Sequence, residues 1–397
     1  MPMINNNTVS TKGTTKPGSR KPSWFVRHLH ALAVTVMALV NALAGAALLL
    51  GAWGGTVDPA RHPLCAVIAM TIPVTLPVML FVLLMDLAWL RRATVWALAC
   101  LFCAAPAWLA TFPVHLPARA LGDSERQRSF TLLSYNVNEG INVNDDYPDG
   151  QNPMMTYILQ ADADVVALQE LGYLTDHWQT HVTAEQMDSL RQRYPYIVPG
   201  HRRLHFAVLS KYPVVADTLI YSDPKASKRG MRRFTLDIKG HRVALFSVHL
   251  QSFGLSDEDK ALYRDLTKLR GEGRMDDVRD DLIDKVEAAA VKRSRQVRNL
   301  AGFIGDARRE GIKDIIVCGD FNDVPASWAV RQLESLGMHE AYASLGFGYK
   351  PTYNASRFWF TIDHVLWSGG LHAHSIERAN MLASDHYPLL TTFVLDD

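Results

Sequence analysis

A short β-branched run meets a cluster of polar side chains at Ile315-Ile316-Val317-Cys318-Gly319-Asp320-Phe321-Asn322-Asp323. The run Ile315–Val317 is bounded by charge on one side and by glycine on the other, which is typical of a buried strand. Asp320 and Asn322 follow it, and alternate side chains of an extended segment point the same way. A carboxylate and an amide that face one site suit a hard cation and a phosphate oxygen. The same residues are ordinary turn formers, so this stretch alone leaves both interpretations open.

The composition divides the chain into an apolar first third and a charged remainder. The 397 residues are 48% hydrophobic and carry a formal net charge of +1. This balance argues against a protein that binds nucleic acid through its overall field alone. Of the four cysteines, only Cys318 lies outside the apolar third. The polar part therefore has no disulfide framework and no zinc-type spacing.

Three apolar runs predict a membrane domain over residues 29–113. Each run is long enough to cross a bilayer as a helix. A cleaved signal peptide is the competing interpretation of the first run, but that run is too long for a typical signal core and a second follows at once. Prolines within the second and third runs are expected to kink these helices. The predicted transmembrane helices cover about 31–53, 64–90 and 93–112.

Basic residues predict the orientation of this membrane domain. Residues 1–28 form a polar tail, predicted to be disordered, whose cations should remain in the cytoplasm. Arg91 and Arg92 form the turn between the second and third runs, on the same side. Asp86 is expected to reach the interface and to pair with these arginines, although a functional role is the alternative. Three spans place everything after residue 113 outside, in the periplasm or on the outer face of a bacterial membrane; if one run does not span, the polar domain lies in the cytoplasm.

The polar part predicts one α/β unit over residues 129–397, after a linker at 114–128. Asn152 is the expected N-cap of a helix at 154–159, and Gly240 is expected to form a hairpin turn. The charged stretch 257–304 favours one or more helices with a solvated face, with an arm that guides a substrate as the alternative. Further strands are predicted at 130–137, 164–170, 206–210, 234–238, 243–250 and 315–317, and a further helix from about Ser327.

Polar side chains recur at the ends of the predicted strands. In α/β sheets, such strand-end groups build the functional site. Each has an ordinary structural explanation when taken alone, because His249 could be a hydrogen-bonded core histidine and Asp363-His364 could be a turn. Six such events in chain order are hard to explain as turns. They are Asn136, Glu170, His249, Asp320 with Asn322, Asp363, and Asp385 with His386.

Six segments that carry these residues resemble the endonuclease/exonuclease/phosphatase superfamily. This group includes pancreatic-type deoxyribonuclease, abasic-site endonucleases, bacterial sphingomyelinases and inositol-polyphosphate 5-phosphatases. The resemblance covers the whole polar domain in family order and implies a four-layer α/β sandwich of two mixed β-sheets, preceded here by three transmembrane helices. The segments are Ser134–Val137, Gln169-Glu170, Ser247–Leu250, Gly319–Asp323, Ile362–Val365 and Ser384–Pro388.

The resemblance implies a metal site and a water-activating group. Glu170 would hold Mg²⁺, with Mn²⁺ as an alternative, and Asn136 would lie beside it. Asp385 would be a further candidate metal residue. Asp320 would orient or deprotonate the attacking water, and Asn322 would donate a hydrogen bond to a phosphate oxygen.

Three further residues receive roles from the same resemblance. His386 would bind the phosphate and contribute to acid-base catalysis or transition-state stabilisation. Asp363 would pair with His386 and raise its pKa. His249 corresponds to a second histidine of the deoxyribonuclease and sphingomyelinase branches, where it is a candidate general acid. The chain departs from many members at Phe360-Thr361, where they carry a basic residue.

These inferences predict a Mg²⁺-dependent phosphodiesterase that acts outside the cytoplasmic membrane. Its substrate would be a lipid head group or another membrane-associated phosphoester, and no obligate protein partner is expected. The first alternative is a membrane-anchored nuclease acting on DNA or RNA, which needs a basic groove. The second is a non-catalytic binding module, although every expected position is filled. The groove would use Arg202-Arg203, Lys225, Lys228-Arg229 and Arg232-Arg233.

Overall fold

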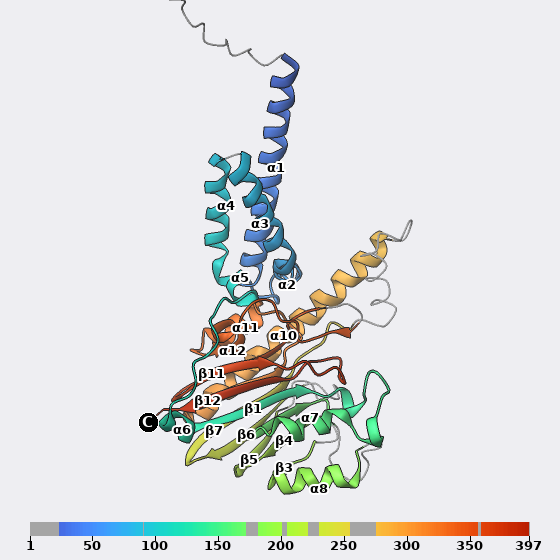
Figure 1. The fold of residues 1–397 in the computed structure, drawn as a ribbon, viewed down its shortest axis with the longest axis vertical. Coiled ribbons are helices and arrows are strands. Elements are labelled where there is room, and N and C mark those ends of the chain that lie inside the picture. Colours follow the sequence, from blue (N-terminus) through green and yellow to red (C-terminus); the bar gives the residue numbers. More distant parts are fainter. Residues whose placement is uncertain are drawn as a thin grey trace, which may run out of the picture.

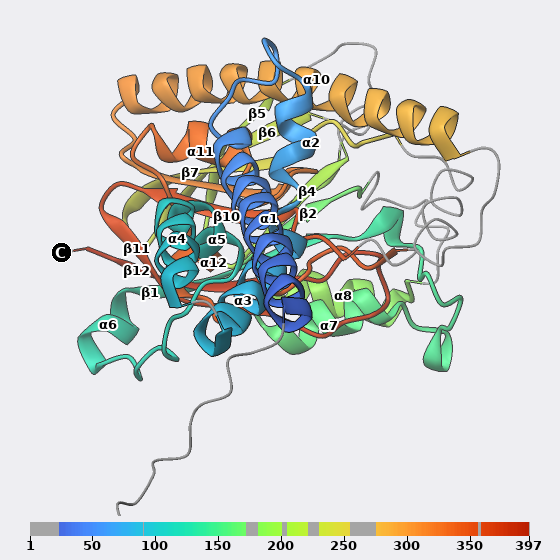
Figure 2. The same cartoon turned by 90° about the horizontal axis from the view of Figure 1, so that it is seen from above.

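A bundle of apolar helices stands on an α/β domain in the computed structural model (Figure 1). The structure describes residues 24–89, 91–171, 182–200, 205–220, 230–254, 275–355 and 359–396. The α/β domain contains two six-stranded sheets. Helices cover both outer faces, and Figure 2 shows α10 along one side of the sandwich with α7 and α8 along the other. The predicted four-layer fold is therefore confirmed.

The first sheet has the strand order β11-β12-β1-β2-β4-β3. Its central pair, β1 and β2, is parallel, and the other neighbours are antiparallel. Because parallel strands end at the same edge, Asn136 lies opposite Gln169. The bounds are β1 Ser129–Asn136, β2 Val165–Gln169, β3 Tyr196–Val198, β4 Phe206–Ser210, β11 Leu371–Arg378 and β12 Leu389–Leu395.

The second sheet has the order β5-β6-β7-β8-β10-β9 and repeats this arrangement. Its parallel pair, β7 and β8, places His249 opposite Asp320. β10 is antiparallel to β8, so its first residue, Asp363, also lies opposite Asp320. The bounds are β5 Val214–Ile220, β6 Gly230–Ile238, β7 His241–His249, β8 Asp314–Asp320, β9 His339–Glu340 and β10 Asp363–Ser368.

Apolar side chains from both sheets form the central core. Phe130 and Phe393 stack with their ring centroids 5.4 Å apart, and Phe234 and Ile316 join them from the second sheet. The second sheet packs its outer face on α10 and α11, and the first sheet packs its outer face on α7 and its neighbours. The helices of this domain are α6 Asp123–Arg128, α7 Pro153–Ala161, α8 Ala184–Arg193, α10 Met275–Arg309, α11 Trp328–Glu334 and α12 Ala341–Leu345, with short 3₁₀ turns at Asn138–Gly140 and Pro148–Gly150.

Local signals in the sequence placed several elements correctly. Asn152 caps α7, since its side-chain oxygen accepts hydrogen bonds from the backbone N–H groups of Met154 and Met155. Gly240 turns β6 into β7 with a left-handed φ of 88°. The predicted linker contains α6, whose start is stabilised by Glu125 reaching back to the N–H of Gly122. In the charged stretch, α10 is one continuous helix, and residues 257–274 lie outside the described part of the chain.

The apolar helices differ from the predicted spans at two breaks. Two helices, 27–54 and 72–89, are long and apolar enough to cross a membrane, and the pair 93–103 with 105–111 is bent by 67°. Proline lacks the N–H that a continuous helix needs, so α2 ends before Pro73 and α4 ends before Pro106. α1 also begins inside the predicted tail 1–28. The bounds are α1 Trp24–Gly54, α2 Leu64–Ala69, α3 Ile72–Trp89, α4 Arg91–Cys103 and α5 Ala105–Thr111.

Asp86 lies fully buried inside the helix bundle. Its Oδ1 accepts a hydrogen bond of 2.8 Å from the side-chain amide of Asn41 on α1. The expectation that this carboxylate reaches the membrane interface is therefore wrong. A buried polar group needs a hydrogen-bonding partner, and here the neighbouring helix supplies one.

The loop between α1 and α2 docks on the α/β domain beside the segment that follows Asp323. Gly55 approaches so closely that an added Cβ would lie 1.8 Å from the carbonyl oxygen of Ala326. Ala326 belongs to the apolar cluster of the helix bundle. Asp58 of the same loop forms an ion pair with Arg298 of α10. The helix bundle therefore contacts the same loop that follows Asp320 and carries Asn322.

Gly319 is the residue of β8 that should tolerate substitution least. Its φ is 128°, and an added Cβ would lie 2.2 Å from the carbonyl oxygen of Val248 on β7. We expect Gly319→Ala to lower the free energy of unfolding by roughly 2–6 kcal/mol, through backbone strain and overpacking. Gly302→Ala is the matched control, because Gly302 lies in α10 with open space around it. Urea denaturation of both variants checks this, and equal stabilities would contradict the close approach of β7 and β8.

Candidate active site

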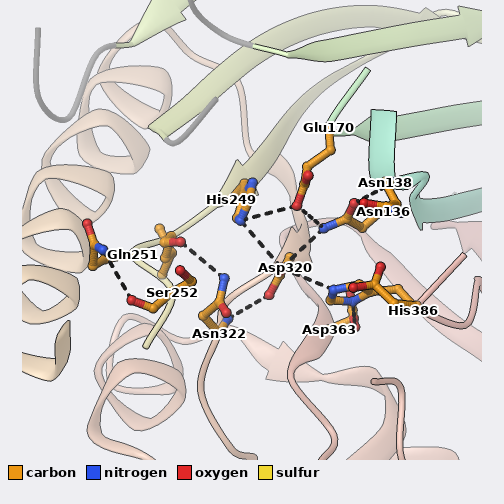
Figure 3. A network of polar contacts seen from close by, with 12 residues as sticks. Asn136, Asn138, Glu170, His249, Gln251, Ser252, Asp320, Asn322, Asp363 and His386 are labelled. Atoms are coloured by element: carbon orange, nitrogen blue, oxygen red, sulfur yellow. Dashed lines mark hydrogen bonds and ion pairs between the residues drawn. The ribbon is translucent and has the colours of Figure 1, made fainter. Parts of the chain in front are cut away.

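The predicted site residues gather at one edge, where strands of both sheets end (Figure 3). Asn136 ends β1, and Glu170 follows β2. His249 and Asp320 end β7 and β8, and Asp363 begins the antiparallel β10. His386 lies on the segment just before β12. The strand-end pattern thus corresponds to one place in space.

Asp320 lies at the centre of this cluster. Its Oδ2 accepts a hydrogen bond of 3.2 Å from the amide of Asn136. The same oxygen lies 3.5 Å from Nε2 of His249 and 3.6 Å from Nε2 of His386. Burial raises the pKa of Asp320, whereas the charges of His386 and His249 lower it and that of Asp363 adds to the rise. The net direction is upward, which suits a carboxylate that takes a proton from water.

Asn322 reaches the site through a turn and not through an extended strand. Its φ is 49°, in the left-handed region, so the expected same-side geometry of alternate residues does not apply. Instead, Oδ1 of Asp320 accepts a hydrogen bond of 2.8 Å from the backbone N–H of Asn322. The Asn322 side chain donates to the carbonyl of Leu250, which follows β7. Asn322 therefore lies beside Asp320 for a reason other than the one predicted.

His386 and Asp363 form a buried, hydrogen-bonded pair. Nδ1 of His386 lies 2.8 Å from Oδ2 of Asp363. Burial disfavours the imidazolium, but the charges of Asp363 and Asp320 outweigh it and raise the pKa of His386 well above its usual value. The ring of Tyr353 lies 4.9 Å from that of His386. The pair can therefore present a cationic N–H at neutral pH.

His249 and Glu170 border the opposite side of Asp320. Nε2 of His249 lies 3.8 Å from Oε1 of Glu170. Among the described residues, no group hydrogen-bonds the buried Nδ1 of His249. Glu170 has a left-handed φ of 53°, which is uncommon for this residue type and is found at functional sites where surrounding contacts hold the backbone.

Two overlapping groups of ligand atoms could hold a divalent ion. Glu170, His249 and Asp320 form one group, and Asp320, Asp363 and His386 form the other. The first group contains two carboxylates, the half-buried Glu170 and the buried Asp320. Carboxylate oxygens are the ligands that Mg²⁺ and Mn²⁺ prefer. The residues present therefore fit such an ion.

Two of the predicted metal residues, Asn136 and Asp385, belong to neither of these ligand groups. Asn136 presents its amide nitrogen to Glu170 and Asp320, while its oxygen accepts from the N–H of Asn138. In this orientation Asn136 positions the two carboxylates. Asp385 belongs to neither ligand group within the described residues. It is half-buried, and its negative charge contributes to the raised pKa of His386.

Buried polar pairs that carry no local sequence signal support the site. Nε2 of Gln169 donates to Oγ of Ser247, and this hydrogen bond of 2.9 Å joins the two sheets. His364 contacts the carbonyl of Asp323 at 2.9 Å and the carboxylate of Glu340 at 3.3 Å. These partners lie far apart in the sequence, so their pairing could not be predicted from spacing.

Arg293 is the largest of these buried supporting groups. Its Nε donates to Oδ2 of Asp323 at 3.1 Å, and Nη1 donates to the carbonyl of Gln251. The guanidinium lies over the ring of Phe253, with 4.7 Å to the centroid. Arg293 thereby ties α10 to the loop after Asp320 and to the segment after His249. Its partners could not be predicted from the sequence.

The basic groove expected of a nuclease is not formed by the described arginines. Arg232 is buried and pairs with Asp217, and Arg233 pairs with Glu310. Each pair neutralises the charge that would attract a phosphate backbone. The remaining groove residues, Arg202-Arg203, Lys225 and Lys228-Arg229, lie outside the described part of the chain.

The contact between Asp363 and His386 predicts a titration change in Asp363→Asn. Because the negative charge of Asp363 raises the pKa of His386, its removal should lower that pKa, and the imidazole should lose its proton at a lower pH. NMR titration of the His386 ring in metal-free protein measures this. His372→Gln, at an exposed histidine, is the control for assignment. An unchanged His386 titration would remove the assigned role of Asp363.

The endonuclease/exonuclease/phosphatase family matches residues 133–386, and a domain of unknown function (DUF8431) matches residues 34–111. No curated protein matches the sequence.

Several solved structures are similar to this chain. Humanized D. rerio TDP2 with 14 mutations is 16% identical, with 67% of this chain and 99% of that chain covered and a TM-score of 0.44. An endonuclease/exonuclease/phosphatase from Beutenbergia cavernae is 15% identical, with 68% of this chain and 72% of that chain covered and a TM-score of 0.45. The human Nocturnin catalytic domain is 17% identical, with 68% of this chain and 95% of that chain covered and a TM-score of 0.43. Since the family match spans most of the chain, this protein belongs to the endonuclease/exonuclease/phosphatase family.

Proposed function

We propose that this protein is a membrane-anchored, Mg²⁺-dependent phosphodiesterase that hydrolyses a lipid head group or another membrane-associated phosphoester. Members of its family are metal-dependent phosphoester hydrolases. One observation carries the proposal: a buried carboxylate, Asp320, contacts Asn136 and lies within 4 Å of both His249 and His386. Carboxylate, amide and imidazole groups are the ones that in-line attack of water on phosphorus needs.

The chain's own groups divide the reaction between them. Glu170, supported by Asp320, would hold Mg²⁺, which polarises a phosphoryl oxygen and neutralises developing charge. Asp320 orients the water and takes its proton, as its raised pKa allows. His386, kept cationic by Asp363, donates a hydrogen bond to a non-bridging phosphate oxygen. The side chain of Asn322 is a second donor beside Asp320.

His249 would supply the proton that the leaving alcohol requires. Its Nε2 lies between Glu170 and Asp320, on the side of Asp320 away from Asp363 (Figure 3). A proton donated by His249 would convert the departing alkoxide into an alcohol.

A membrane-associated substrate is supported by the contact between the helix bundle and the α/β domain. Gly55 and Asp58 hold the bundle against Ala326 and Arg298, so the site lies a short distance from the proposed bilayer. No described contact favours a nuclease, because Arg232 and Arg233 are paired. A non-catalytic module is disfavoured because every expected site position is filled.

The proposed domain division and orientation follow from the direction of the helices. The tail 1–28, the membrane domain 29–113 and the linker 114–128 precede the catalytic domain 129–397. α1 approaches the α/β domain, α3 leaves it, and α4 with α5 return to it (Figure 1). Three such passages, together with the basic residues that precede α1 in the sequence, support a cytoplasmic start and a catalytic domain outside the cytoplasmic membrane.

Loss of metal or of single site groups should abolish hydrolysis. We expect the purified full chain to cleave bis-p-nitrophenyl phosphate with Mg²⁺ or Mn²⁺, to stop when EDTA is added, and to recover with excess Mg²⁺. Glu170→Gln, Asp320→Asn and His386→Ala should each lower kcat by roughly 100-fold or more, because each removes an acid-base, phosphate-binding or metal-holding group.

Calorimetry can separate these roles. Glu170→Gln should lose Mg²⁺ binding, whereas His386→Ala should retain it. Asp188→Asn is the matched carboxylate control, since Asp188 is exposed on α8 and its pair with Arg191 is a surface one. Near-normal turnover in any of the three site variants would remove the role assigned to that residue, and hydrolysis unaffected by EDTA would refute the metal dependence.

Reporter fusions test the orientation. Alkaline phosphatase fused after residue 397 should be active in a bacterial host, because the enzyme folds only outside the cytoplasm. The same reporter fused after residue 89, between α3 and α4, should be inactive, and a cytoplasmic fluorescent reporter at that position should be bright. The reverse pattern would place the catalytic domain in the cytoplasm.

A further inference from the structure

A cavity of about 880 Å³ lies where the linker leaves the helix bundle and crosses the edge of the first sheet. The linker descends from α5 past α12 toward α6 (Figure 1). None of the site residues lines this cavity. Its walls are residues 115–119 and 121 of the linker, the end of α12 with the loop to Lys350, residues 374–378 of β11, and Thr392.

The membrane-proximal wall of this cavity is held in place by backbone contacts. Phe112, which directly follows α5, stacks on Tyr349 with 5.2 Å between ring centroids. Val114 forms a β-bridge with Phe347, and the N–H of His115 donates to the carbonyl of Gly346. The linker is therefore held against the loop after α12 and forms an ordered wall of the cavity.

Large apolar side chains stand exposed on this wall. Leu116 is 88% exposed, Phe347 is 66% exposed, and the adjacent Val114 is 65% exposed. Three such residues close together are unusual for a surface that meets only water. They lie just beyond the last residue of α5, where a bilayer would end. Acyl chains would cover them.

The rest of the cavity is cationic. Lys350 is exposed and forms no ion pair within the described residues. The guanidinium of Arg378 lies 4.1 Å from the ring centroid of Tyr387, and its buried Nε has no hydrogen-bond partner in the described chain. Arg119 is neutralised by Glu125, and Glu377 is the one acidic residue among the lining residues. Two cations thus remain available to an anion.

We propose that this cavity binds one anionic phospholipid of the surrounding bilayer, at a site separate from the catalytic residues. Lys350 and Arg378 would bind the head-group phosphate, and Leu116 and Phe347 would contact the acyl chains. An apolar wall next to a membrane helix, with two cations lining the same cavity, matches the acyl chains and the phosphate of an anionic phospholipid. The proposal rests on the membrane anchoring proposed above and does not require hydrolysis.

Native mass spectrometry tests this site. The full chain is incubated in detergent with phosphatidylglycerol or phosphatidylcholine, and the lipid that stays bound after removal of the detergent in the spectrometer is measured. The Asp320→Asn background keeps any lipid intact, so binding is measured whether or not that lipid is a substrate. We expect one phosphatidylglycerol to be retained in preference to phosphatidylcholine. Lys350→Gln should weaken this retention roughly five-fold, the contribution expected of one cation near an anionic lipid. Leu116→Ser should weaken retention of both lipids.

Lys313→Gln is the matched control, because Lys313 is exposed and does not line the cavity. It should leave retention unchanged, and unchanged melting temperatures would show that the variants fold. Equal retention of the two lipids, or wild-type retention by Lys350→Gln, would overturn the proposal. Displacement of the lipid by millimolar glycerol phosphate would also overturn it, because the cavity would then take a soluble phosphoester. Activity assays score the proposed hydrolysis separately.

Discussion

The burial of the Asp320 carboxylate is the constraint on which the site depends. An ionised carboxylate that leaves water loses hydration worth on the order of several kcal/mol, and its surroundings must compensate. Asn136, the backbone of Asn322 and two histidines provide that compensation. Each comes from a different strand end or loop, so the carboxylate is satisfied only when both sheets are aligned. The environment that Asp320 needs therefore forms only when the two sheets of the sandwich pack correctly.

The sequence predicted the strands and most of the site because the signals are local. β-branched runs mark β2 and β8, an N-cap marks α7, and polar residues at strand ends mark the site edge. The family resemblance then supplied roles that no pattern contains. A turn at Asn322 was one of the two interpretations that the sequence left open, and the structure shows it as a left-handed φ of 49°.

Long-range polar pairs mark the limit of such prediction. Asp86 was expected at an interface, yet it pairs with Asn41, 45 positions away, because helix packing decides which groups meet in an apolar bundle. The pairs of Glu340 with His364 and of Arg293 with Asp323 are similar, since they join segments that only the folded sandwich brings together. Prolines predicted bends in the apolar helices, and the pair of α4 and α5 is bent by 67° at the break before Pro106, whereas Pro77 lies inside the continuous helix α3.

The contact of Gly55 with Ala326 has a consequence for how such an enzyme meets its substrate. A catalytic domain on a flexible tether changes its position relative to its anchor, whereas this domain is held in one position against the helix bundle. For a chain anchored as proposed, the search is confined to lateral diffusion in two dimensions. A scissile bond is reached only if it stands off the bilayer by the same height as Asp320. The loop between α1 and α2 would thereby set the distance of the site from the bilayer. Substrates would be selected by how far their scissile bond protrudes from the bilayer as well as by their chemistry.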